Sequence, residues 1–322
     1  MRDQTGELPD WLTPGGKRYF SADAAYRRQF GRKAVKLPLD AGFTCPNRDG
    51  RKGAGGCAYC SGAGSGDFAE SALLPLDVQY RRQRERLAGK WPGAAPIAYF
   101  QAFTNTYGPV ERIQAMLEEA AALPEIAGIA LATRADCIDG EIAGRIAEIA
   151  RRLPVEVELG LQTAHDETAG RINRCHSFAE FKEGYRLLAG RGIPVCVHLI
   201  NGLPGETKEM MLETVRAVSR LRPHGVKIHM LHLLRGTALG AAYEARLFPL
   251  LSMEEYIDVV CDQLELLPPE TVIERLTGDG KRSGLIAPGW TLRKKSVLNG
   301  IDRELRRRDS WQSKRFSEEG AG

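Results

Sequence analysis

The feature that most constrains the fold is a regular alternation of strand-like and helical segments between residues 34 and 234. Residues 34–39 alternate in polarity like a half-buried strand. A later segment carries apolar residues at helical spacing, at Ile142, Ile146 and Ile149. Because crossovers between parallel strands are right-handed, this order predicts an α/β fold whose parallel sheet either stays open or curls into a barrel. The six expected strands span residues 34–39, 96–103, 126–132, 155–161, 193–200 and 225–234.

The chain is expected to consist of one core and two extensions. The core covers residues 34–236, the N-terminal extension residues 1–33 and the C-terminal extension residues 237–322. No flexible linker separates them, so the C-terminal extension is expected to pack on the core. It contains, in order, a helix, an extra strand and a basic amphipathic helix, at residues 252–267, 271–275 and 291–308.

Composition places the chain among proteins of a reducing compartment. With 322 residues and 43% hydrophobic content, it can bury a sizeable core without cross-links. Its seven cysteines are an odd number, and neither an apolar signal segment nor a run of about 18 apolar residues occurs. We therefore expect a cytoplasmic protein whose thiols are free to bind metal.

Polar and reactive side chains follow the expected strands. Three cysteines come after the first strand, Gln101 and Thr104 after the second, and Gln162 after the fourth. In parallel α/β sheets, ligand sites lie at the carboxyl ends of the strands. These side chains are therefore predicted to gather at one rim of the sheet.

The three cysteines lie on a glycine-rich stretch that we call the cysteine loop, residues 45–60. Cys57 and Cys60 form a C-x-x-C pair, and Cys45 precedes them by eleven intervening residues. Thiolates suit zinc and iron–sulfur clusters, and three ligands leave one metal position open. From the loop alone, a structural zinc site and a redox-active dithiol remain alternatives.

Positive charge is concentrated near the C-terminal end. Residues 281–315 contain eleven Lys or Arg against three Asp or Glu, a net charge of +8, whereas the whole chain carries +4. The remainder therefore carries 4 − 8 = −4. Such a concentration is typical of a polyanion-binding surface, although a solvated helix face gives the same pattern.

Five stretches together resemble the radical S-adenosylmethionine (SAM) superfamily. More narrowly, the chain resembles the bacterial YhcC/YtqA type, which is related to the elongator-catalytic-subunit and oxygen-independent coproporphyrinogen oxidase groups. The resemblance implies a partial (β/α)6 barrel that binds a [4Fe–4S] cluster and S-adenosylmethionine. The stretches that carry it are residues 39–50, 99–107, 158–163, 198–207 and 275–280.

The resemblance also implies roles for individual residues. The cluster ligands would be the three cysteines, although the superfamily usually separates the first two by three residues rather than eleven. The usual glycine-rich stretch after the second strand is replaced here by residues 101–104, and a carboxylate on the third strand by Ala132. The implied metal ligands are Cys45, Cys57 and Cys60, and the implied cofactor contacts are Tyr59, Gln101, Thr104, Gln162, Arg174 and His198.

The resemblance and the charge pattern lead to three functional hypotheses. The first is a radical SAM enzyme that abstracts hydrogen from tRNA, at a wobble uridine side chain, with electrons from a flavodoxin or ferredoxin. The second is a radical SAM enzyme for a small-molecule or porphyrin-like substrate. The third is a zinc-stabilised nucleic-acid-binding module without catalytic activity.

Overall fold

The computed structural model describes residues 16–64, 66, 68–278 and 282–317. Residues 1–15 of the expected N-terminal extension, residues 279–280 of the last resembling stretch and Lys281 of the basic segment lie outside the described residues. The chain divides into two compact units. The cysteine-loop unit comprises Tyr26–Leu161 and Asn173–Cys196, and the C-terminal unit comprises Met1–Ala25, Gln162–Ile172 and Val197–Gly322. The expected segments 1–33, 34–236 and 237–322 stay a prediction.

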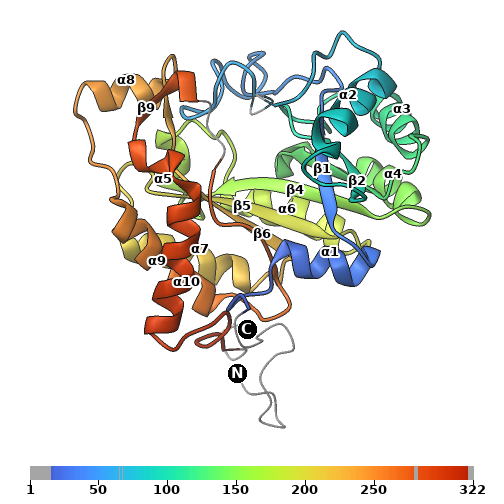
Figure 1. Ribbon diagram of the computed structural model, residues 1–322. Coiled ribbons are helices and arrows are strands. Elements are labelled where there is room, and N and C mark those ends of the chain that lie inside the picture. Colours follow the sequence, from blue (N-terminus) through green and yellow to red (C-terminus); the bar gives the residue numbers. More distant parts are fainter. Residues whose placement is uncertain (1–15, 65, 67, 279–281, 318–322) are drawn as a thin grey trace. The chain divides into compact units, whose positions relative to one another are not determined.

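The cysteine-loop unit is built on parallel strands that alternate with helices (Figure 1). Neighbouring strands pair in register, with Ala34 opposite Ala95 and Ile97 opposite Gly128. The strands are β1 (Ala34–Leu39), β2 (Ala95–Phe100), β3 (Gly128–Thr133) and β4 (Val155–Gln162), and the helices are α1 (Ala22–Phe30), α2 (Leu76–Ala88), α3 (Val110–Ala121), α4 (Gly140–Ala150) and α6 (Phe178–Ala189).

A buried ionic cluster shows that these strands curve. The Lys36 ammonium on β1 lies 2.6 Å from the Glu156 carboxylate and 2.7 Å from the Glu158 carboxylate, both on β4. The Tyr99 hydroxyl on β2 donates to Glu158 at 2.8 Å. In a flat sheet, β1 and β4 would lie about 14 Å apart, three spacings of about 4.8 Å. The side chains meet because the sheet bends toward this face, as in a barrel wall.

Local sequence explains the helices that follow the strands. In α4, Ile142, Ile146 and Ile149 are all buried, as their spacing predicts. The carboxylate of Asp139 caps this helix by accepting a hydrogen bond from the Ile142 amide at 2.8 Å. Pro109 precedes α3, where the fixed φ of proline favours a helix start.

The C-terminal unit continues the alternation. Its strands are β5 (Val195–Asn201), β6 (Gly225–Met230) and β8 (Val272–Arg275), and the sheet order is β1-β2-β3-β4-β5-β6-β8. A separate antiparallel pair joins β7 (Leu233–Leu234) to β9 (Leu285–Ala287). The helices are α5 (Asp166–Arg171), α7 (Lys208–Ser219), α8 (Ala238–Glu244), α9 (Met253–Leu266) and α10 (Lys294–Arg307).

The expected α/β fold with a parallel sheet is confirmed, with one difference in detail. The single strand expected at 225–234 is wrong beyond Met230, because the Leu231 amide bonds to the Asn201 carbonyl and the chain turns before β7. The extra strand expected at 271–275 exists and pairs in parallel with β6. Every helix among the described residues is too short or too polar to span a lipid bilayer.

A glycine contact provides a test of this packing. A Cβ added at Gly184 of α6 would lie 2.1 Å from the backbone oxygen of Ala135, whereas nothing lies within 4 Å of a Cβ at Gly144 of α4. Gly184→Ala should therefore lower the free energy of unfolding by about 1–3 kcal/mol through overpacking. Gly144→Ala should raise it by about 0.4–1 kcal/mol through helix propensity. Urea unfolding measures both, and equal stabilities would contradict the described contact.

Candidate functional site

The cysteine loop leaves β1 and folds back on itself. The Arg48 amide bonds to the Cys45 carbonyl at 2.8 Å, and the Cys60 amide bonds to the Cys57 carbonyl at 2.9 Å. The Gly56 amide reaches the Asn47 carbonyl at 2.8 Å, which returns the C-x-x-C pair toward the start of the loop. All three cysteines are reduced rather than disulfide-bonded, and all three are half-buried.

Two polar side chains of the loop point at its sulfurs. The Asn47 amide nitrogen donates to the Cys57 sulfur at 3.5 Å. The Arg48 guanidinium donates to the Cys60 sulfur at 3.4 Å. Burial, and then the neighbouring Cys60, raises the pKa of Cys57, and the hydrogen bond from Asn47 offsets part of this rise by favouring the thiolate.

Tyr59 lies against the C-x-x-C pair. Burial first, and then the nearby charges of Cys57 and Cys60, raise the pKa of its hydroxyl well above the usual value. A neutral phenol at this point can donate a hydrogen bond to the Cys57 sulfur.

The loop after β2 is joined to both ends of the cysteine loop. The Thr104 amide bonds to the Thr44 carbonyl at 3.2 Å, and the Phe103 amide bonds to the Gly64 carbonyl at 2.8 Å. The structure thus joins the Gln101–Thr104 stretch to Thr44 and Gly64, on either side of the cysteine loop, and the cofactor roles of Gln101 and Thr104 stay predictions. Thr104 is buried and Gln101 is half-buried.

Asn173 holds the middle of the cysteine loop through hydrogen bonds that we call the Asn173 clasp. Its amide nitrogen donates to the carbonyls of Ala54 at 3.2 Å and Gly56 at 2.8 Å, and its own carbonyl accepts from Asn47. Both Asn173 and Cys175 adopt a positive φ, 52° and 60°. Sequence reasoning missed Asn47 and Asn173. For Asn173, the tolerance of asparagine for the left-handed region was the one available signal.

Arg174, predicted to contact a cofactor carboxylate, directly follows Asn173 and is buried. Its guanidinium donates to the carbonyls of Leu161 and, at 2.8 and 3.0 Å, of His176. These bonds fix the turn between β4 and α6. The cofactor role of Arg174 stays a prediction.

A buried charge network lies at the end of β3. Arg134 forms a two-pronged pair with Asp136, both bonds 2.9 Å long, and donates to the Arg174 carbonyl at 2.8 Å. Lys52 of the cysteine loop lies 2.9 Å from the same carboxylate. Burial opposes the Arg134 charge, but Asp136 and the thiols of Cys57 and Cys45 together raise its pKa. The charge of Arg134 therefore interacts favourably with Cys57 and Cys45.

The remaining predicted contacts belong to the C-terminal unit. Gln162 ends β4 with a φ of 64°. His198 lies on β5, with its ring centroid 5.3 Å from that of His229. Burial and the neighbouring His198 lower the pKa of His229. Both predicted contacts stay predictions.

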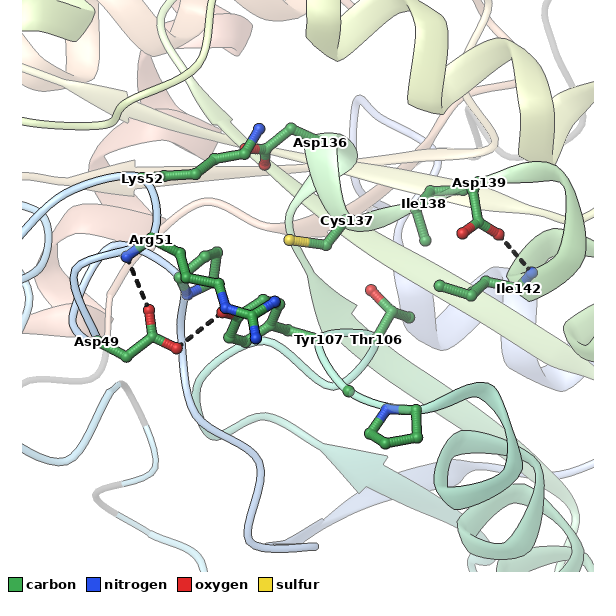
Figure 2. A pocket seen from close by; sticks show the side chains of 13 residues that line it. Asp49, Arg51, Lys52, Thr106, Tyr107, Asp136, Cys137, Ile138, Asp139 and Ile142 are labelled. Carbon is green, nitrogen blue, oxygen red and sulfur yellow. Dashed lines mark hydrogen bonds and ion pairs between the residues drawn. The ribbon is translucent and has the colours of Figure 1, made fainter.

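A cavity of about 770 Å³ opens beside the cysteine loop (Figure 2). Its wall includes Pro46, directly after Cys45, and Cys137, directly after Asp136. Burial and then Asp136 raise the pKa of Cys137 to about 12, so this thiol is neutral. Sequence reasoning did not foresee this cavity.

In no described part of the chain do three His, Cys, Asp or Glu side chains form a group that could hold one metal ion. A [4Fe–4S] cluster requires a wider spacing of its ligands than one metal ion does, because each thiolate binds its own iron and the sulfurs are spread around the cluster.

The basic segment is less positive than its composition indicates. Arg308 pairs with four carboxylates, at 2.5 Å with Asp262, 2.7 Å with Glu304 and 3.8 Å with Glu265, and also with Asp258. Arg315 lies 3.3 Å from Glu265. The exposed Lys or Arg side chains of this segment that form no ion pair with a described residue are Arg293, Lys295, Arg303, Arg306 and Lys314.

Comparison with known proteins identifies the class. The family model described as the radical SAM superfamily matches residues 47–218, which is more than half of the chain, and the model of the radical SAM C-terminal domain matches residues 223–307. The chain therefore belongs to the radical SAM superfamily. It is an enzyme that uses a [4Fe–4S] cluster and S-adenosylmethionine, and its chemistry requires a reductant.

Its relatives narrow the group to the YhcC/YtqA type, as predicted. The chain is 47% identical over 300 residues to YtqA of Bacillus subtilis, covering 93% of each chain. It is 36% identical over 283 residues to YhcC of Escherichia coli, covering 86% of this chain and 89% of that one. The fold is shared with archaeal Elp3 from Methanocaldococcus infernus, at a TM-score of 0.61 and 19% identity over 74% of this chain and 60% of that chain.

The charge network predicts a pH-dependent stability. Burial alone would raise the pKa of Asp136, but Arg134 and Lys52 lower it, so the carboxylate contributes stability above the pKa of an unfolded Asp, about 3.9, and loses it as pH falls through the lower folded pKa. Asp136→Asn should cost about 3 kcal/mol at pH 7, because it leaves a buried guanidinium unpaired.

Urea unfolding at pH 7 and pH 3 measures both effects, and the gap between wild type and Asp136→Asn should narrow at the lower pH. Asp77→Asn is the matched control, because its pair with Arg81 is exposed on both sides and should contribute less than about 1 kcal/mol. Equal losses in the two variants would contradict a buried network.

Proposed function

We propose that Cys45, Cys57 and Cys60 hold the [4Fe–4S] cluster. Three observations support this assignment. The three cysteines are not disulfide-bonded, and they share one folded loop. Asn47 and Arg48 donate hydrogen bonds to two of the sulfurs, and the charge of Arg134 acts on Cys57 and Cys45. The donor set fits the cluster, because thiolates are its usual ligands and hydrogen bonds to sulfur tune its potential.

The orphaned oxygen of Asn47 also fits an occupied polar site. This atom is buried and has no hydrogen-bond partner among the described residues. Buried polar atoms are normally paired, so an unpaired one beside the thiols indicates a missing partner.

When bound, the cluster and S-adenosylmethionine supply a 5′-deoxyadenosyl radical that abstracts hydrogen from a substrate. The chain's own residues do the positioning. Arg134 offsets the negative charge of the thiolates, and the bonds from the 101–104 stretch hold the loop against β2. We assign the contacts to S-adenosylmethionine to Tyr59, Gln101, Thr104, Gln162, Arg174 and His198. A flavodoxin or ferredoxin would deliver the electron.

Replacing one cluster ligand tests this assignment. Cys57→Ala should fold normally, lose most of its iron and form no 5′-deoxyadenosine with dithionite and S-adenosylmethionine. Cys261→Ala, a buried cysteine of α9, is the matched control and should keep its iron. Iron analysis, circular dichroism and product chromatography measure these outcomes. Loss of the fold in Cys57→Ala would argue instead for a structural metal.

The substrate that we propose is tRNA, modified at a wobble uridine side chain. The observation that carries this proposal is the exposed face of α10. Lys295, Arg303 and Arg306 lie within about one quarter of the helix circumference, opposite the buried Val297 and Ile301. A row of unpaired cations on one helix face fits a phosphate backbone. The motif resemblance to the elongator group and the fold shared with Elp3 support the same substrate class.

Nucleoside mass spectrometry of tRNA from a deletion strain tests the substrate directly. Loss of one modified nucleoside, restored by the wild-type gene but not by Cys57→Ala, is the expected result. An unchanged nucleoside profile together with an accumulated metabolite would favour a small-molecule substrate instead.

Binding measurements test the α10 face. Replacing Lys295, Arg303 and Arg306 together by Gln should weaken tRNA binding and reduce the slope of log affinity against log salt by about 2–3, because three phosphate contacts are lost. The matched control replaces Arg186, Arg220 and Arg235, which are exposed and lie outside α10, by Gln. Gel shifts over a salt series measure both slopes. Identical slopes in the two variants would show that this face of α10 does not bind tRNA.

A further inference from the structure

The cavity beside the cysteine loop is not used by the assignments above. It lies at the carboxyl ends of β2 and β3, where parallel sheets bind ligands. Its volume of about 770 Å³ falls in the range of sites for small organic groups. Pro46, Pro109, Ile138 and Ile142 give it apolar wall segments.

The carboxylates of the cavity wall are already engaged. Asp49 accepts hydrogen bonds from the Tyr107 hydroxyl at 2.7 Å and the Arg51 amide at 3.1 Å. Asp136 is held by Arg134 and Lys52, and Asp139 caps α4. The charge of Asp136 is offset by these cations, whereas Asp49 and Asp139 are bonded to neutral donors and keep their negative charge.

Arg51 and Tyr107 form the exposed edge of this cavity. The Arg51 guanidinium lies 5.9 Å from the centre of the Tyr107 ring and forms no ion pair with any described residue. The hydrogen bond to Asp49 fixes the orientation of the ring. Figure 2 shows the Cys137 sulfur pointing toward this pair. The edge thus offers one aromatic face, one planar cation and an apolar wall behind them.

We propose that this cavity binds one unpaired nucleotide of the RNA substrate, with its base against Tyr107 and its phosphate at Arg51. The inference rests on the proposed function, and it names the residues that receive the RNA near the cluster. Proteins read single-stranded RNA by stacking bases on aromatic rings and arginine planes.

The charge of the cavity favours RNA over a free nucleotide. A nucleotide within RNA carries one negative charge per phosphate, which one unpaired guanidinium can balance. A free mononucleotide or triphosphate carries two or more charges, and it would meet the carboxylates of Asp49, Asp136 and Asp139 with one unpaired cation available in this wall.

The test measures fluorescence anisotropy of a fluorescein-labelled anticodon stem-loop RNA with the reconstituted holoenzyme under anaerobic conditions. Tyr107→Leu and Arg51→Gln should each weaken binding by about tenfold, the order expected for a lost stacking or phosphate contact. Tyr107→Phe should stay within about twofold of wild type, because the ring is kept. Arg186→Gln, an exposed arginine of α6, is the control and should bind like wild type.

The outcomes separate this inference from the proposed function. If the wild-type protein binds no RNA, both the proposed RNA substrate and the nucleotide site in the cavity are wrong. If Tyr107→Leu and Arg51→Gln bind RNA as well as the wild-type protein does, only the assignment of the cavity as an RNA site is wrong. If circular dichroism shows that Tyr107→Leu does not fold, the RNA affinity of Arg51→Gln, a change at an exposed residue, tests the cavity instead. Uridine 5′-monophosphate that displaces the RNA at the RNA's own concentration would assign the cavity to a free nucleotide and overturn the RNA assignment.

Discussion

The fixed shape of the cysteine loop is the constraint on which the site depends. Glycines let this loop turn, but they also make it costly to order, because each ordered residue loses backbone freedom. Bonds from outside hold it: the amides of Phe103 and Thr104 reach its two ends, and Asn173 bonds to its middle. The thiols therefore come to one place through contacts with the ends of neighbouring strands.

Electrostatics reinforces this arrangement. Burial first, and then the neighbouring Cys60, raises the pKa of Cys57, so gathering thiolates in this half-buried loop is costly. Arg134 supplies the compensating charge, and Asp136, which also pairs with Lys52, holds its guanidinium in place. Because the network joins the cysteine loop to the turn after β3, it links the packing of the sheet to the charge state of the sulfurs.

The sequence predicted the features that depend on local pattern. The alternation of strands and helices, the cysteine loop after β1 and the buried isoleucines of α4 all follow from spacing and turn chemistry. It could not predict the cavity or the Asn173 clasp, because these contacts join residues far apart in the chain. The expected +8 tail shows the same limit. Its charge run is visible in the sequence, but the carboxylates of α9 that neutralise Arg308 lie about 50 residues away.

The contact between Gly184 and Ala135 links α6 to the turn that carries Arg134 and Asp136. No side chain fits between the two backbones, so the turn rests directly on the helix. A relative with a larger residue at this position has to displace the turn, and the guanidinium with it. Glycine at this helical position is therefore a marker of the packing between α6 and the Arg134–Asp136 turn. It distinguishes relatives that share this packing from relatives that share only the three cysteines.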